Sequence, residues 1–437
     1  MYSGRDSSAE PVCVGKGRGV MARIGETIRN LRERMGVSQD TLAEWVGVSR
    51  ATVAQIELGR RSPESLELFR MADFFGCTVS DLMENEPETL APVGVRFRRA
   101  LGVDRDSAIW ETVARCMRLA RETEGLRRML DIGRSEDCLP GYRLPGPSGK
   151  PEAIRQGYGV AREERSRLKL GTDRIENMGE LLESQGVFAG QMDMPRNVSG
   201  FTLNIDGVGI ICMANVRHSG LRRRFSMAHE YGHALMDSAH GAIVSKSEDR
   251  DELLEVRANV FAAAFLMPEQ GMLEMIRRIG KGAPTREQTD VYDEQEATRV
   301  ERRQSASDQE IQLYDAARLA FYFGVSIQAV LYRLKNLRVI GQSRLEKLLD
   351  EESTEEGAHL RRVMHIHDDD RRLEEPDLLR NTVLNMALEA LRRELISRGK
   401  CLEIAGLACD RQKLGDLEIL VDSIAPRTGS VSIPDED

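Results

Sequence analysis

The sequence predicts a mainly α-helical protein with a small β region near its middle. Apolar residues repeat at helical spacing through residues 22–84, and helical patterns return at 108–132 and 153–183. Between residues 186 and 215 the pattern changes to short apolar runs with a turn signal between them, which is typical of strands and a hairpin. Aromatic residues make up only 5% of the 437 residues, which favours a leucine- and alanine-based core packed between helices.

The domain organisation follows from length and from breaks in composition. A chain of 437 residues favours two or three domains. Proline, glycine and acidic residues gather at 84–105 and 133–151, and a polar stretch at 281–309 interrupts the later helical pattern, which otherwise continues through most of 220–337. We therefore expect a disordered leader (1–20), a helical bundle (21–84), a linker with a helix (85–152), an α+β domain (153–275), a helical continuation with a polar insert (276–340) and a charged helical C-terminal region (341–437).

Composition excludes several classes of protein. The net charge is −9, so binding to nucleic acid would have to come from a local patch. The seven cysteines are scattered without a C-x-x-C pair, which indicates reduced thiols and a cytoplasmic location. No apolar run approaches the ~18 residues of a membrane-spanning helix, and the N-terminus lacks the apolar core of a secretory signal.

Two short helices joined by a tight turn are predicted between residues 38 and 60. Ser38 and Ser49 each precede a helical pattern and can cap it, and Gly47 supplies the positive φ that the turn requires. The second helix is expected to present side chains suited to reading base edges, while the start of the first can hold a phosphate. The candidate DNA-binding residues are Gln39, Ser49, Arg50, Ala51, Thr52 and Gln55.

This segment, SQ-x-x-LA-x-x-x-GVS-x-x-x-V-x-x-IE-x-G-x-x-x-P from Ser38 to Pro63, resembles the Xre/Cro-type helix-turn-helix of bacterial and phage repressors. The resemblance implies that residues 21–84 form a five-helix DNA-binding bundle. A helical bundle used for protein contact is the alternative. The segment carries 8 basic against 10 acidic residues, so its affinity for DNA would gain from a homodimer.

His229-Glu230-Tyr231-Gly232-His233 forms an H-E-x-x-H motif. Residues four apart lie on one face of a helix, so both imidazoles can reach one Zn²⁺ ion, and Glu230 beside them can activate a water molecule. Tyr231 points away from that face, which favours a role in core packing. The alternatives are an exposed helix with two incidental histidines, or a metal site kept for structure or sensing.

A catalytic zinc site needs a third protein ligand. Residues 248–257 hold several carboxylates, and most of them lie in a charged run. Glu255 lies on the same face as the apolar residues of the helix that follows and that ends at Pro268. It is therefore the acid that we expect to be buried with this helix.

The segments R-F-S-M-A-H-E-x-G-H, ending at His233, and E-x-x-A-N-x-F-A-x-x-x-L-M-P, beginning at Glu255, resemble the ImmA/IrrE family of zinc metallopeptidases. The resemblance covers residues ~150–270 and implies a zincin-like α+β fold. It also implies Zn²⁺ held by His229, His233 and Glu255, Glu230 as the catalytic base, and a specific repressor as substrate. The family commonly has threonine where Ser226 stands, and the segments 281–309 and 341–437 are not clearly family-like.

The leading hypothesis is a cytoplasmic DNA-binding regulator with zinc-dependent endopeptidase activity. It would cleave a specific repressor or partner protein in stress response or mobile-element control. One alternative is a transcription regulator whose peptidase-like domain acts only as a sensor or partner-binding module. Another is an antitoxin-like or phage-type repressor that binds a partner protein.

Three other histidines are candidates for a role in a site. His240 could line the cleft and steady an oxyanion. His365 and His367, with the acidic residues that follow them, could bind a metal, although a solvated charged turn explains the same pattern.

Overall fold

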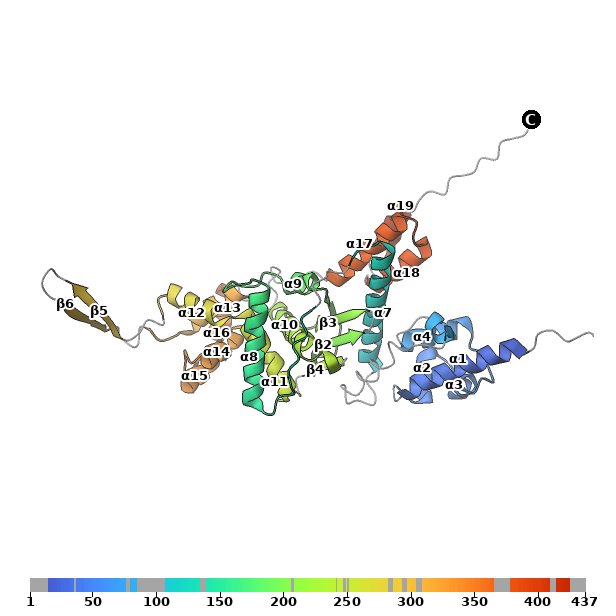
Figure 1. The fold of residues 1–437 in the computed structure, drawn as a ribbon, viewed down its shortest axis with the longest axis horizontal. Coiled ribbons are helices and arrows are strands. Elements are labelled where there is room, and N and C mark those ends of the chain that lie inside the picture. Colours follow the sequence, from blue (N-terminus) through green and yellow to red (C-terminus); the bar gives the residue numbers. More distant parts are fainter. Residues whose placement is uncertain are drawn as a thin grey trace, which may run out of the picture. The chain divides into compact units, whose positions relative to one another are not determined.

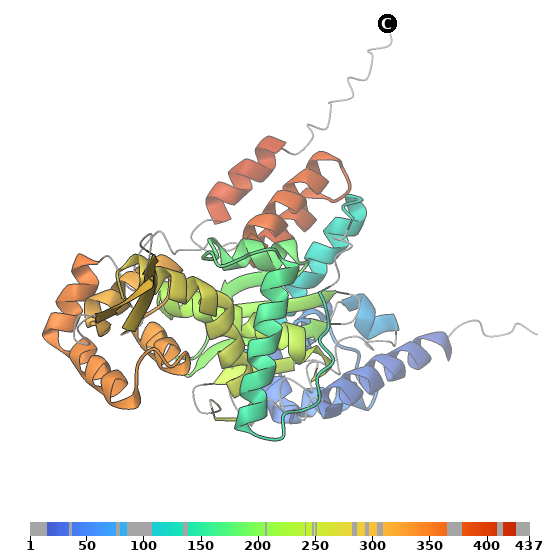
Figure 2. The same cartoon turned by 60° about the vertical axis from the view of Figure 1, so that its left-hand side comes forward.

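The computed structural model describes residues 15–34, 37–75, 79–84, 107–133, 139–205, 208–240, 242–246, 249, 251–281, 286–292, 297–303, 309–364, 378–408 and 414–424. Its contacts divide the chain into two units, one formed by Met1–Gly125 with Ile205–Val208 and the other by Leu126–Asn204 with Gly209–Asp437. Helices dominate both units, and the second contains a small sheet (Figures 1 and 2). The predicted fold class is therefore confirmed.

The first unit contains the predicted bundle of short helices. They are α1 (Gly15–Arg34), α2 (Gln39–Val46), α3 (Arg50–Glu57), α4 (Ser65–Phe75) and α5 (Val79–Glu84). Helix α1 begins at Gly15, so residues 15–20 are helical where a disordered leader was expected. Adding residues to a helix that has already formed costs less free energy than nucleating a new helix. The amphipathic part of α1 can therefore extend through this glycine-containing turn at its N-terminus. Residues 1–14 lie outside the described part.

Local signals around the turn between α2 and α3 act as the sequence predicts. The Ser38 side chain accepts a hydrogen bond from the Thr41 backbone amide at 3.0 Å, and that of Ser49 accepts from the Thr52 amide at 3.1 Å. Gly47 ends α2 with a φ of 77°, a left-handed conformation that favours glycine.

The second unit is built on a four-stranded sheet of β1 (Phe188–Met192), β2 (Val198–Ile205), β3 (Gly209–Asn215) and β4 (Ala242–Lys246). The strand order is β1-β3-β2-β4, with β1 parallel to β3 and β2 antiparallel to β4. The strands expected at 186–215 are confirmed. Strand β4 interrupts the helical pattern expected through most of 220–337, because pairing with β2 decides the state of this five-residue segment.

Helices form most of the rest of the described chain. The first of them, α7 (Ser107–Met129), spans the division between the units at Gly125. The others are α8 (Lys150–Arg167), α9 (Met178–Ser184), α10 (Gly220–Met236), the 3₁₀ helix η1 (Ser238–His240), α11 (Leu253–Leu266), α12 (Glu269–Arg278), α13 (Leu313–Phe323), α14 (Ile327–Asn336), α15 (Gln342–Ser353), α16 (Glu355–Val363), α17 (Leu378–Arg392), α18 (Arg398–Ala408) and α19 (Leu414–Ile424).

The layers of the second unit place α10 at its centre. Helix α10 packs against strand β3 on one side and α11 on another, and α11 packs in turn against α8 (Figure 1). Tyr231 of α10 meets Phe261 and Phe265 of α11 in a buried aromatic cluster, with ring centroids 5.2–6.0 Å apart. Tyr231 thus packs in the core as predicted.

The polar stretch 281–309 contains a second, two-stranded sheet. Strands β5 (Arg286–Tyr292) and β6 (Ala297–Arg303) pair antiparallel. This hairpin was not expected, because its residues are mostly charged and lack the apolar alternation that predicts strands. Among the described residues, no helix is both long and apolar enough to cross a membrane.

Candidate metal centre

Helix α10 and helix α11 bring three potential ligands together. The Nε2 atoms of His229 and His233 lie 3.1 Å apart. The Glu255 carboxylate lies 3.2 Å from each of them, Oε2 toward His229 and Oε1 toward His233. All three side chains are buried, and their ligand atoms fall within 4.8 Å of one another. The structure therefore places Glu255, rather than Asp249, Asp251 or Glu252, beside the histidine pair.

The outer nitrogen of each imidazole faces an oxygen. His233 Nδ1 lies 2.8 Å from Asp237 Oδ2, and His229 Nδ1 lies 3.0 Å from Asn259 Oδ1. Such partners orient a metal-binding imidazole and assign its proton to Nδ1. Sequence reasoning missed both residues, although Asp237 lies four positions after His233 and Asn259 four after Glu255, on the same helix faces.

A buried ion pair holds Asp237 in its position beside His233. The other carboxylate oxygen of Asp237 accepts a hydrogen bond from Arg257 Nη2. Arg257 is 2% exposed and also donates from Nη1 to Gln156 Oε1 of helix α8 at 2.8 Å. A chain of contacts therefore runs from α8 through α11 to the His233 ring.

The donor set fits a divalent cation. With a proton on each Nδ1, the two Nε2 lone pairs and the Glu255 carboxylate all point at one another. Three such acceptors repel unless a positive charge lies among them, and two imidazoles with one carboxylate form a known ligand set of catalytic Zn²⁺. Burial raises the pKa of Glu255, but the two imidazoles outweigh it and bring that pKa to about 2. Burial lowers the pKa of His233, but Asp237 and Glu255 outweigh it and raise that pKa to about 10, so a proton on Nε2 supplies the positive charge unless a cation displaces it.

Glu230 lies fully buried on the side of α10 that faces the sheet. Its Oε2 accepts a hydrogen bond from Thr202 Oγ1 of strand β2 at 2.7 Å. Its Oε1 makes no hydrogen bond of ordinary geometry among the described residues, and the Ser245 side chain of strand β4 lies close to the carboxyl group. A Cβ on Gly200 would lie 2.7 Å from Oε1 and 2.5 Å from the Met213 carbonyl oxygen, so glycine leaves the room that this carboxyl group occupies. Burial raises the pKa of Glu230, and the neighbouring imidazoles offset only part of this effect.

The candidate DNA-binding residues lie where α3 meets solvent, with one exception. Ser49, Arg50, Ala51 and Gln55 are exposed, and Thr52 is half-buried. Gln39 at the start of α2 is half-buried, and its Nε2 donates to Glu57 Oε2 at 2.8 Å.

Two further histidine predictions have different outcomes. His240 belongs to η1, and its Nδ1 lies 3.1 Å from the Asp237 carbonyl oxygen, so that nitrogen contacts backbone. The His365 and His367 prediction lies outside the described residues.

The fold and site together define a class of protein, one that joins a helix-turn-helix to a domain similar to the metallopeptidases. Residues 28–82 match the family model described as helix-turn-helix, and residues 194–285 match the IrrE N-terminal-like domain. Over 66 residues the chain is 41% identical to the radiation response metalloprotease IrrE of Deinococcus radiodurans. That match spans 14% of this chain and 20% of the relative. No solved structure matches the chain.

Proposed function

We propose that this protein is a DNA-binding regulator and a zinc-dependent endopeptidase that cleaves a specific repressor or partner protein. One observation carries the enzymatic part, namely the convergence of His229, His233 and Glu255 beside the buried carboxyl group of Glu230. The similarity to a protein named for a radiation response supports a role in stress. A sensor module would need the ligands but would not need a base beside them.

The roles of this chain's own residues follow from their positions. Bound Zn²⁺ would supply a Lewis acid that polarises a peptide carbonyl and acidifies water. Glu230 would accept a proton from the attacking water at its Oε1 and later deliver it to the departing amine. Thr202 holds the other oxygen, Oε2, and so fixes the carboxyl plane. The apolar residues around α10 exclude bulk water, which strengthens each electrostatic interaction.

Removing Glu255 is expected to remove the metal. In Glu255→Ala, two imidazoles remain, so we expect metal content to fall from about one ion per chain to a small fraction of that value. Metal content after dialysis, measured by plasma mass spectrometry on the full chain, checks this. Glu252→Ala is the matched control, since Glu252 precedes the same helix and is exposed without a capping hydrogen bond. Equal zinc content in both variants would contradict the assignment of Glu255 as a ligand.

DNA recognition is assigned to the exposed face of α3. Gln55→Ala removes a side chain suited to bidentate base readout, and the loss of such a pair costs about 1–3 kcal/mol of discrimination. We expect affinity for a duplex selected by the parent chain to fall, with the salt dependence unchanged because no charge is lost. Fluorescence anisotropy measures both, and Asn30→Ala, an exposed polar change on α1, is the control. If Gln55→Ala binds with an unaltered sequence preference, Gln55 does not take part in base recognition.

The proposed function is tested by comparing new protein N-termini in cells that express the parent chain or its Glu230→Gln variant, with and without DNA damage. A cleavage present only with the parent would support the endopeptidase and identify its substrate. A cleavage site within a repressor would connect the peptidase to gene control. Identical sets of N-termini in both conditions would contradict the endopeptidase and favour the sensor role.

A further inference from the structure

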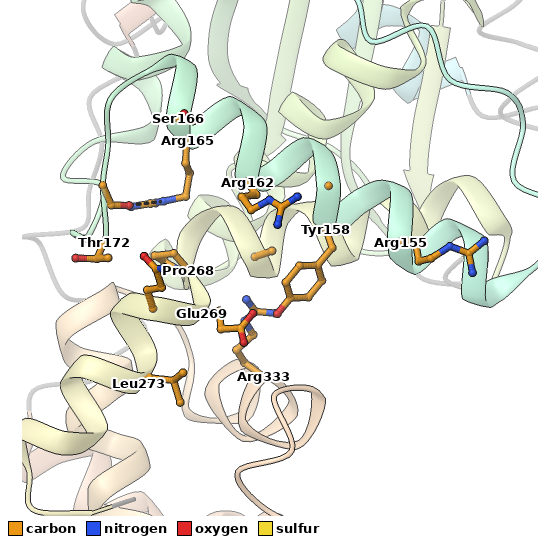
Figure 3. Close-up of a pocket in the computed structure, with 14 residues that line it drawn as sticks. Arg155, Tyr158, Arg162, Arg165, Ser166, Thr172, Pro268, Glu269, Leu273 and Arg333 are labelled. Carbon is orange, nitrogen blue, oxygen red and sulfur yellow. Dashed lines mark hydrogen bonds between the residues drawn. The ribbon is translucent and has the colours of Figure 1, made fainter.

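A cavity of about 870 Å³ lies in the second unit, and none of its lining residues belongs to the metal cluster. Helix α8, the start of α12 and helix α14 supply most of its wall (Figure 3). Its charged and aromatic lining residues are Arg155, Tyr158, Arg162, Arg165, Glu269 and Arg333. Four arginines thus face one glutamate, which makes the cavity positive in a chain whose net charge is −9.

Arg333 is the buried cation of this cavity. It is 2% exposed, its Nε donates to the Met267 carbonyl oxygen at 2.9 Å, and its guanidinium lies 4.6 Å from the Tyr158 ring centroid. Figure 3 shows Tyr158 directed from α8 toward Arg333 and Glu269. Arg333 Nη2 has no hydrogen-bond partner among the described residues. Burial lowers the pKa of Arg333, and the nearby Tyr158 and Glu269 offset only part of this effect. A buried donor without an acceptor is costly, and an anion in the cavity would remove that cost.

The other arginines divide into two kinds. Arg165 donates to the backbone oxygens of Phe265, Gly171 and Asp173, so it builds the wall of the cavity. Arg155 and Arg162 of helix α8 are exposed, and the described residues offer neither of them a hydrogen bond or an ion pair. Two guanidinium groups at the rim and one in the interior therefore have donors available for a ligand.

We propose that this cavity binds a small organic phosphate, with the phosphate between Arg162 and Arg333 and the body of the molecule against the apolar wall. Guanidinium groups pair with phosphate through two parallel hydrogen bonds, and a phosphate has more acceptor oxygens than a carboxylate to share among several arginines. The cavity volume lies in the range of sites for drug-sized ligands and is far larger than one inorganic ion needs. Ala264, Pro268 and Leu273 supply the apolar surface.

Calorimetric titration of the full chain with adenosine monophosphate tests the proposal. We expect saturable binding, weaker binding of inorganic phosphate and none of adenosine. Arg162→Gln is expected to weaken binding of the nucleotide about tenfold or more, because it removes a charged hydrogen-bond donor from an exposed position that folding does not need. The matched control is Arg278→Gln, which removes the same charge from an exposed position of α12 outside the cavity lining.

Three other results would contradict the proposed phosphate site in part or in full. Equal binding to the parent, Arg162→Gln and Arg278→Gln would place the nucleotide elsewhere, including at the metal centre. If none of the probes shows saturable binding, the cavity is not a phosphate site. Citrate that binds as tightly as the nucleotide, with the same dependence on Arg162, would replace phosphate by carboxylate as the recognised group.

Discussion

Replacing Glu230 by glutamine is expected to lower the rate of substrate cleavage by about 10²–10⁴-fold, the usual contribution of a positioned acid–base group. The amide keeps the size of the side chain and can still accept from Thr202, but it cannot take a proton from water. Glu230 is not one of the three clustered ligand residues, so we expect metal content to stay at the parental level. The measurement is the single-turnover rate on the substrate identified in cells, with metal content determined on the same samples.

The control for this variant is Glu180→Gln, an exposed acid in the first turn of α9. It should cleave at the parental rate. A parental rate in Glu230→Gln itself would show that another group accepts the proton. Loss of metal together with activity would mean that Glu230 acts on the metal site rather than as a base.

Arg257→Met should destabilise the second unit at its metal centre. Removing one partner of a buried ion pair costs about 3–5 kcal/mol, because the remaining charge is buried without compensation. Here the buried charge of Asp237 would lose its guanidinium partner and keep only the His233 ring beside it. We also expect metal affinity to fall about 10–100-fold, as is typical when a partner that orients a ligand is lost.

Amide hydrogen exchange of helix α10 measures the free energy of local opening in this variant. The only tryptophans, Trp45 and Trp110, belong to the first unit, so their fluorescence would not report on it. Arg222→Met, an exposed change on α10, is the control. Adding Asp237→Asn to Arg257→Met should recover part of the lost protection, because it removes the uncompensated charge. Unchanged exchange in Arg257→Met would contradict a stabilising role for the pair.

Local sequence determined the parts of this protein that depend on neighbours along the chain. Ser38, Ser49 and Gly47 act on backbone groups within a few residues, so the helix-turn-helix could be predicted with its caps and its turn. His229 and His233 share a helix face by periodicity alone. The same periodicity selected Glu255 among several carboxylates, and the structure brings it within 3.2 Å of both histidines.

Only the tertiary structure decided which distant groups meet these residues. Arg257 reaches Asp237 and Gln156 because α11 packs between α8 and α10, and no local pattern encodes that contact. Strand β4 forms because β2 offers it a pairing edge, and Gly200 of β2 leaves room for Glu230 because the sheet lies against α10. The arginine-lined cavity likewise joins segments more than 150 residues apart in the sequence. Periodicity predicts which face of an element is buried, whereas packing selects the partner of that face.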